Sequence, residues 1–277
     1  MKKFRKLIKL AAICALFIVP AVALSGCGKQ TAIKKNDIKV GVVGSQDNKI
    51  WKPIQNKLRH RGIHLKVVDF SDYTQPNQAL QHHNIQLNAF QHYLFLHNWN
   101  SKNHGDLTPV ARTVVAPLGL YSYKIHKPSQ LKDGDTVTLP NDATNEGRAL
   151  NLLKSAGLIK LKKAALPTTK DVIDNKKHLK LKPIDAAQTP RTLKDAKAAV
   201  INNTFAEEAK LSNNSLIFNE KLNKKIVPYI NILVSNKKDK NNKYIKDIIK
   251  AYQTKSTAKN IKKNFGDAEK PAWNLKF

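Results

Sequence analysis

Hydrophobic positions along this chain recur with two periods, one typical of buried strands and one typical of helices. The runs IKVGVVG (38–44) and HLKVVDF (64–70) are short and nearly uninterrupted, as in the strands of a parallel sheet. Between them the pattern predicts a helix whose apolar face carries Ile50, Trp51, Ile54 and Leu58. Pro53 is compatible with this helix only in its first turn.

The same alternation continues to the C-terminus. A strand, a loop and a helix are predicted over 135–157, and further strands in 113–125 and 226–236. The last helix places Ile245, Ile248, Ile249 and Tyr252 at positions i, i+3, i+4 and i+7. Strands that alternate with helices predict an α/β protein, and the sequence has no Gly/Ser-rich linker. We therefore expect two lobes joined by strands.

The N-terminus has the pattern of an export signal. Five basic residues lie between positions 2 and 9, an apolar run covers 11–24, and the tetrapeptide Leu-Ser-Gly-Cys ends at Cys27. The apolar run is shorter than the ~20 residues of a membrane-spanning helix. The tetrapeptide resembles the bacterial lipobox, which implies a signal peptide over 1–26 followed by a lipidated Cys27 and a tether over 27–37. We expect lipid anchoring at the extracytoplasmic face of the cell membrane.

The charge balance is strongly basic, at +29 with 49 Lys and Arg against 20 Asp and Glu. Segment 1–26 holds five of the basic residues and no acidic one, so a chain that begins at Cys27 keeps +24. The lysines are spread over the chain, without an RNP motif, a recognition-helix signature or a basic arm. This distribution does not predict a nucleic-acid partner, and it is compatible with a body beside an anionic envelope.

Five ordered blocks, together with the lipobox, closely resemble the NlpA-type lipoproteins, the methionine-uptake substrate-binding proteins of ABC importers. The blocks are FSDYTQPNQAL (70–80), LNAFQHYLFL (87–96), LPNDATNEGRALNLLKSAGLIKL (139–161), TPRTLKDAKAAVINNTFA (189–206) and VPYINILV (227–234). The resemblance implies a two-lobed periplasmic-binding-protein fold. Each lobe would be a mixed, mostly parallel sheet flanked by helices, with the ligand in the cleft between lobes. It also implies lobe one over 38–122 plus 233–277 and lobe two over 123–232.

A free amino acid needs partners for its carboxylate, its ammonium and its side chain. Arg148 suits the carboxylate, because a guanidinium forms a planar bidentate pair with it. Asn145 lies three residues earlier on the same helix face, near a helix N-terminus that favours an anion. A lone arginine in so lysine-rich a chain is more typical of a solvated helix face. The resemblance nevertheless places Asn145 and Arg148 on the family's ligand-contacting positions.

The resemblance adds six further residues to the cleft: Tyr73, Phe90, His92, Phe95, Asn202 and Asn231. Asn231 interrupts the apolar run 230–234, where a polar side chain needs a partner. Phe90 and Phe95 can hold a thioether, since sulfur–aromatic contacts contribute about 0.3–1.5 kcal/mol each. Phe95 stands where tyrosine is usual in the family, which removes one possible hydrogen bond. No ligand contact is predicted for Leu94, Leu96, His97, Trp99 and Asn203, which are neighbours of these residues in the sequence.

A metal-binding importer lipoprotein is the alternative function. Seven of the nine histidines lie between His60 and His104. Zinc accepts imidazole readily, but no His-x-His or Glu-x-x-His spacing occurs. Cys14 falls in the signal segment, so a mature chain keeps Cys27 alone and has neither a disulfide nor a cysteine-rich zinc site. We therefore predict no metal site.

Enzymatic activity is not predicted. Neither GxSxG nor HExxH occurs, and GVVGS (41–45) lacks the third glycine of a dinucleotide loop and the lysine of a phosphate loop. We expect a lipoprotein without cofactor that captures L-methionine or a close derivative and delivers it to an ABC permease with its ATPase. A methionine-containing dipeptide is a second possible ligand.

Overall fold

The computed structural model describes residues 33–34 and 37–276. The expected signal peptide 1–26 and the lipidation at Cys27 lie outside the described residues, as does most of the tether. Within the described ranges, no helix combines the length and the apolar character needed to cross a membrane.

The first sheet has the strand order β2-β1-β3-β13-β4. Strand β1 is parallel to both β2 and β3, whereas β13 is antiparallel to β3 and β4. The strands are β1 (Ile38–Val43), β2 (Leu65–Phe70), β3 (Leu87–His92), β4 (Thr108–Arg112) and β13 (Asn231–Ser235). The accompanying helices are α1 (Asn48–Arg59), α2 (Gln75–Gln81), α3 (Tyr93–Asn103), α6 (Lys243–Tyr252) and α7 (Lys255–Phe265).

The second sheet has the order β10-β7-β11-β6-β12, and its first three strands are parallel. Its elements are β6 (Gly119–Tyr121), β7 (Thr136–Pro140), β10 (Lys180–Ile184), β11 (Ala198–Ile201) and β12 (Leu216–Asn219), with helices α4 (Ala143–Ser155) and α5 (Asn203–Glu208). Two short pairs join β5 (Val114–Val115) to β14 (Lys270–Pro271) and β8 (Lys160–Leu161) to β9 (Val172–Asp174). The 3₁₀ helices are Pro128–Gln130, Thr169–Asp171, Ala186–Lys194, Asn213–Ser215, Lys224–Tyr229 and Lys237–Asp239.

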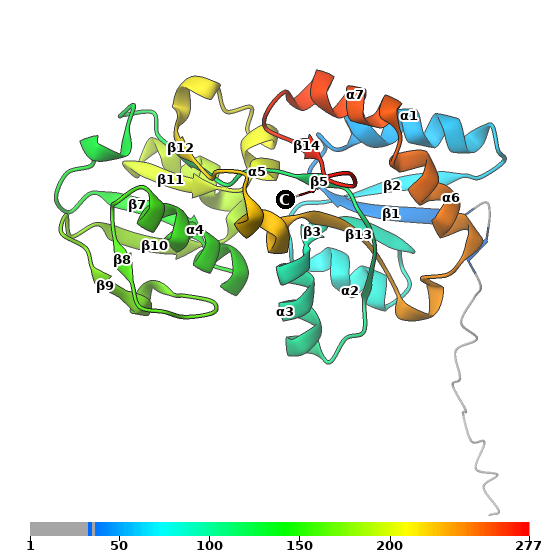
Figure 1. The fold of residues 1–277 in the computed structure, drawn as a ribbon, viewed down its shortest axis with the longest axis horizontal. Coiled ribbons are helices and arrows are strands. Elements are labelled where there is room, and N and C mark those ends of the chain that lie inside the picture. The colour runs from blue at the N-terminus through cyan, green and yellow to red at the C-terminus, as the bar shows by residue number, and fades with distance from the viewer. Residues whose placement is uncertain (1–32, 35–36, 277) are drawn as a thin grey trace, which may run out of the picture. The chain divides into compact units, whose positions relative to one another are not determined.

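The predicted fold class is confirmed: two lobes each contain a mixed sheet flanked by helices, and β5 and β14 lie where the lobes meet (Figure 1). The strand pairings differ from the expected lobe limits in two places. Strand β6 pairs in the second sheet, although 38–122 was expected in lobe one, and Asn231 pairs with His92 in the first sheet, although it was expected in lobe two. The first difference follows from Pro117, which divides the run 113–125 because proline cannot donate to a strand ladder. The lobe limits otherwise stay a prediction.

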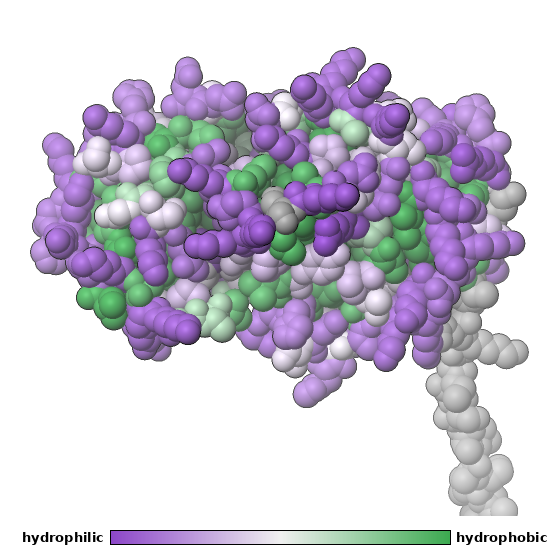
Figure 2. All heavy atoms as spheres, in the orientation of Figure 1, coloured by the Kyte–Doolittle hydropathy of each residue, from purple (hydrophilic) through white to green (hydrophobic). Residues whose placement is uncertain are grey.

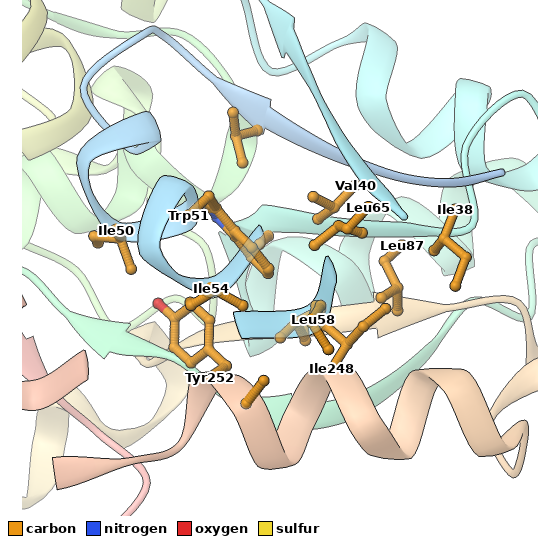
Figure 3. Packing of buried hydrophobic residues seen from close by; sticks show 14 of the residues in the cluster. Ile38, Val40, Ile50, Trp51, Ile54, Leu58, Leu65, Leu87, Ile248 and Tyr252 are labelled. Atoms are coloured by element: carbon orange, nitrogen blue, oxygen red, sulfur yellow. The ribbon is translucent and has the colours of Figure 1, made fainter. Parts of the chain in front are cut away.

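Helix α1 carries the predicted apolar face, which packs toward α6 (Figure 3). The rings of Trp51 and Tyr252 lie 5.1 Å apart. The expectation for Pro53 was wrong: it lies inside α1 rather than in the first turn. Pro53 cannot donate to the Lys49 carbonyl, and Asn260 of α7 donates its Nδ2 to that oxygen instead, at 2.7 Å. A contact from a distant helix therefore accommodates the proline.

Hydrophilic side chains cover both lobes on the face shown in Figure 2. This matches the spread of lysines along the sequence, since both lobes contribute them. The described apolar residues form five buried clusters, and the three largest are one on each sheet and a third that takes residues from both lobes.

Candidate functional site

A cavity between the two lobes, partly open to solvent, contains about 480 Å³ of space not filled by atoms. All eight predicted ligand contacts line it: Tyr73, Phe90, His92, Phe95, Asn145, Arg148, Asn202 and Asn231. The structure thus brings together residues from both sheets and from segments more than 150 positions apart. Their role in binding stays a prediction. The remaining lining residues are Gln91, Ala116, Pro117, Leu118, Asn203, Thr204, Tyr229 and Glu269.

Aromatic side chains form one wall of the cavity. The ring of Tyr73 lies 5.8 Å from that of Phe90 and 6.1 Å from that of Phe95, and the last two rings meet edge to face at 5.7 Å. Phe205 of α5 comes from the second lobe and approaches the Tyr73 ring to 4.8 Å. These distances fall in the range of favourable ring pairs. The wall offers an apolar, polarisable surface and connects the lobes.

His92 is the last residue of β3 and the N-cap of α3, so its side chain has a fixed orientation. Its Nδ1 accepts from the Phe95 N–H at 3.0 Å. Burial, followed by the Arg148 charge, lowers the pKa of His92 to about 3. The ring is therefore neutral, and with Nδ1 accepting, its proton lies on Nε2. Nε2 is buried without a hydrogen-bond partner among the described residues, which makes it a donor available to a ligand.

Arg148 of α4 is bound to the protein along one edge. Its Nε and Nη2 donate to the Glu220 carboxylate at 2.9 and 2.6 Å, and Nη2 also donates to the Ala116 carbonyl at 2.9 Å. The guanidinium lies over the Tyr229 ring at 4.5 Å. The expected bidentate pair with a ligand is therefore not open through Nε and Nη2, because Glu220 occupies that edge. Nη1 is the nitrogen with no acceptor among the described residues.

Asn145 is held by two neighbours. Its Nδ2 donates to Asp142, the N-cap of α4, at 2.9 Å, and its Oδ1 accepts from Asn202 Nδ2 at 2.9 Å. Through these bonds the Asn145 amide positions Asn202, which follows β11 and is the N-cap of α5. Asn202 Oδ1 is left buried without a partner among the described residues, so it is an acceptor available to the cavity.

Asn231 lines the cavity, and the stretch 94–99 is divided between buried and exposed positions. Asn231 begins β13 beside His92 of β3, and its side chain lines the cavity from the first sheet. Leu96 is buried and Trp99 packs against the same cluster, whereas His97 is exposed. Leu96 and Trp99 thus pack as expected, whereas Leu94 is half-buried and lies in none of the apolar clusters of the described residues; the ligand contacts of this segment stay a prediction.

Three residues of the site were missed by sequence reasoning. Glu220 and Tyr229 lie on the segment 220–230, which leads from the second sheet back to the first, and both contact Arg148. Glu269 precedes β14, and its Oε1 accepts from Asn203 Nδ2 at 2.9 Å, so Asn203 also belongs to the site. Glu220 and Glu269 stand in no pattern that predicts chemistry, because each acquires its partner only in the folded chain, whereas Tyr229 and Asn203 stand in two of the family blocks.

Three buried polar atoms without partners belong to residues that line one cavity. Four such side-chain atoms occur among the described residues, and His92 Nε2, Asn202 Oδ1 and Glu269 Oε2 belong to residues that line this site. A buried polar group without a partner costs about 1–3 kcal/mol. A ligand that accepts from the first atom and donates to the other two removes this cost. The site is thus complementary to a small molecule with an anionic and a cationic end.

The described residues contain no group of three or more His, Cys, Asp or Glu side chains that could hold a metal ion. The zinc alternative therefore has no preformed ligand set in the described ranges.

Two sheet-containing lobes with a cavity of this kind between them are typical of the two-lobed substrate-binding proteins. The chain belongs to the NlpA lipoprotein family, whose sequence model matches residues 38–273. It is 37% identical to a probable D-methionine-binding lipoprotein MetQ of Haemophilus influenzae, over 97% of this chain and all of the relative. It is also 36% identical to lipoprotein 28 of Escherichia coli K12, over 94% of this chain and 96% of that one.

Two solved structures carry the same fold. The substrate-binding protein of a methionine transporter from Streptococcus pneumoniae is 40% identical, with a TM-score of 0.81 over 85% of this chain and 95% of that one. A nutrient-binding protein from Burkholderia cenocepacia, solved bound to methionine, is 36% identical, with a TM-score of 0.81 over 85% of this chain and all of the other.

Proposed function

We propose that this protein is the extracytoplasmic substrate-binding lipoprotein of an ABC importer and that it captures methionine or a close derivative. The observation that carries the proposal is the set of unpartnered buried atoms in the cavity, one donor and two acceptors, beside an aromatic wall. The names of the relatives and of the solved structures point to the same ligand. Binding, rather than catalysis, is the activity that this arrangement supports.

Each part of the amino acid has a partner in this proposal. The carboxylate accepts from Arg148 Nη1 and His92 Nε2, which are charged and neutral donors respectively. The ammonium donates to Asn202 Oδ1, while Asn145 fixes the orientation of that amide. The thioether packs among Tyr73, Phe90 and Phe95, where sulfur meets ring edges and faces.

Binding is coupled to closure of the lobes about the two crossings, residues 116–118 and 220–230. Ala116 and Glu220 on these crossings both bind Arg148, which supports a direct link between ligand contact and hinge position. The lobes are proposed as 38–122 plus 233–277 and 123–232, adjusted for the positions of β6 and Asn231.

Lipid on Cys27 holds the protein at the outer face of the membrane beside its permease and ATPase in this proposal. Cys27→Ser removes the lipidated thiol, so we expect the variant to move from the membrane fraction to the soluble extracytoplasmic fraction. Labelling cells with a tagged palmitate tests the modification directly. A variant that still takes up label and stays with the membrane contradicts the anchor.

The ligand is tested by thermal denaturation of the lipid-free domain after unfolding and refolding, which removes carried-over ligand. The panel contains L-methionine, D-methionine, a methionine-containing dipeptide, methionine sulfoxide and zinc chloride. A ligand at 100 times its Kd adds about 2.7 kcal/mol to the free energy of unfolding. A rise in midpoint with a methionine compound supports the proposal and ranks the enantiomers. A rise with zinc alone replaces it with the metal-binding alternative.

A further inference from the structure

Glu269 contributes one of the two unpartnered oxygen atoms among the residues that line the cavity. Its side chain is 94% buried, at 6% exposure, in the segment just before β14. One carboxyl oxygen is fixed by Asn203 of α5, from the opposite lobe, and the other has no partner among the described residues. The residue lines the site cavity and also an adjoining cavity of about 380 Å³ that it shares with Asp47, Thr204 and Asn231.

The groups that act on Glu269 are acidic. Burial, then the charges of Asp47 and Glu207, raise its pKa well above the ordinary value. Asp47 lies at the start of α1 and Glu207 lies on α5, so acidic groups approach from both lobes. A buried carboxylate among other acids is unfavourable, so the raised pKa favours the neutral form of Glu269 until a cation joins it and takes the place of the proton. The cationic side chain of the site, Arg148, is already paired with Glu220.

We propose that Glu269 is the principal acceptor for the ligand's ammonium group, with Asn202 as the second, and that it makes the site selective for a free amino group. The inference rests on the proposed function, because it assigns one end of the amino acid. Glu269 lines the cavity with its Oε2 buried and without a hydrogen-bond partner among the described residues, and Asn203 holds the other oxygen in place.

The assignment also sets the ligand's direction. Arg148 Nη1 and His92 Nε2 are donors for the carboxylate, and the acidic residues Glu269 and Asp47 border the adjoining cavity. An amino acid therefore lies with its carboxylate toward Arg148 and its ammonium toward Glu269. The reverse orientation places a carboxylate beside two acids, which like-charge repulsion disfavours.

The test is a thermodynamic cycle between one side chain and one ligand group. Calorimetric affinities are measured for refolded wild-type protein and for Glu269→Gln, each with L-methionine and with 4-(methylsulfanyl)butanoate, which is methionine without its amino group. We expect Glu269→Gln to weaken methionine binding by about 10- to 100-fold, the range for a hydrogen bond to a charged group. The affinity for the desamino compound should change by less than about threefold.

Asp106→Asn is the control, because it removes an exposed carboxylate that lines neither cavity and does not act on Glu269. It should leave the ratio of the two affinities unchanged. Equal losses for both ligands in Glu269→Gln overturn the inference, since they indicate a structural role only. Retained methionine affinity in Glu269→Gln also overturns it and leaves the proposed function intact. Wild-type protein that binds no amino acid overturns the proposed function, and the inference with it.

Discussion

Arg148 is held by the protein on three sides, and this determines what it can offer a ligand. Glu220 takes the Nε edge, Ala116 accepts from Nη2, and the Tyr229 ring lies against the guanidinium plane. A lysine presents a single ammonium on a flexible stem and cannot fill these positions together. The arginine is thus needed for its shape as well as for its charge.

Arg148→Lys should weaken methionine binding by about 100-fold, which corresponds to about 3 kcal/mol for a charge-assisted hydrogen bond and its lost orientation. Titration calorimetry on refolded protein measures the change. Arg191→Lys is the control, because Arg191 is exposed and donates only to Gln188. Wild-type affinity in Arg148→Lys would show that charge alone is sufficient.

His92 should make the stability of the protein depend on pH. Its pKa is about 3 in the folded chain because of burial and Arg148, against about 6.5 when unfolded. Below pH 6.5 the unfolded chain therefore binds the extra proton, so the stability present at neutral pH is lost as the pH falls. Between pH 7 and pH 5 this one group accounts for about 2 kcal/mol.

Urea unfolding at the two pH values, for wild type and His92→Gln, checks the prediction. The variant should lose about 2 kcal/mol less than wild type between pH 7 and pH 5. His97→Gln, at an exposed position of α3, should follow wild type. Parallel pH profiles for His92→Gln and wild type would contradict a neutral buried imidazole.

Helix α4, at the scale of elements, is positioned by a close contact at a glycine. A Cβ on Gly147 would lie 3.0 Å from Pro167 Cδ and 3.3 Å from the backbone N and O of that residue. Backbone atoms do not move aside as a flexible side chain does, so the absent side chain lets the Pro167 segment pack on α4. The next residue of α4 is Arg148, so this packing also fixes the site.

Gly147→Ala should lower the free energy of unfolding by about 1 kcal/mol. Alanine favours a helix by about 1 kcal/mol over glycine, but overpacking costs about 1–3 kcal/mol. Guanidinium unfolding measures the balance, with Lys154→Ala at an exposed position of α4 expected to stay within about 0.5 kcal/mol. A stabilised Gly147→Ala would mean that the Pro167 segment yields at little cost.

At the scale of the whole molecule, contacts outside the cavity also connect the lobes. Glu208 of α5 accepts from the Ser45 N–H at 2.9 Å and from the Ser45 hydroxyl at 3.1 Å. The Phe205 and Tyr73 rings meet across the same gap. These contacts hold the two lobes together without any contribution from a ligand. The more they stabilise this arrangement, the less free energy ligand binding has to supply for closure.

Glu208→Ala should weaken methionine binding by about three- to tenfold, because the closed arrangement loses hydrogen bonds of about 1 kcal/mol. Calorimetry gives the affinity, and the lining of the cavity is left intact. Asp133→Ala removes an exposed carboxylate of the same lobe that makes no contact with the described residues of the first lobe, and it should have no effect. An equal decrease in the two variants would reflect net charge rather than closure.

The sequence by itself determined the local elements, the α/β class and the family. The apolar face of α1 could be predicted because helical period and burial coincide at Ile50, Trp51, Ile54 and Leu58. The eight residues of the site could be named because they stand in family blocks, not because their chemistry is visible in isolation. The position of Pro53 in its helix was predicted wrongly, because the hydrogen bond that the proline cannot donate is replaced by one from Asn260, more than 200 positions away.

Only the tertiary structure decided which residues of the site form hydrogen bonds and ion pairs with one another. Glu220 and Glu269 are two acidic residues among twenty in the sequence, and nothing near them predicts that one neutralises Arg148 and the other lies unpaired in the cavity. Hydrogen bonds and charge pairs depend on distances of a few ångströms between segments far apart in the chain. Periodicity reports which face of an element is buried, but the partners of a buried polar atom are fixed only when the lobes come together.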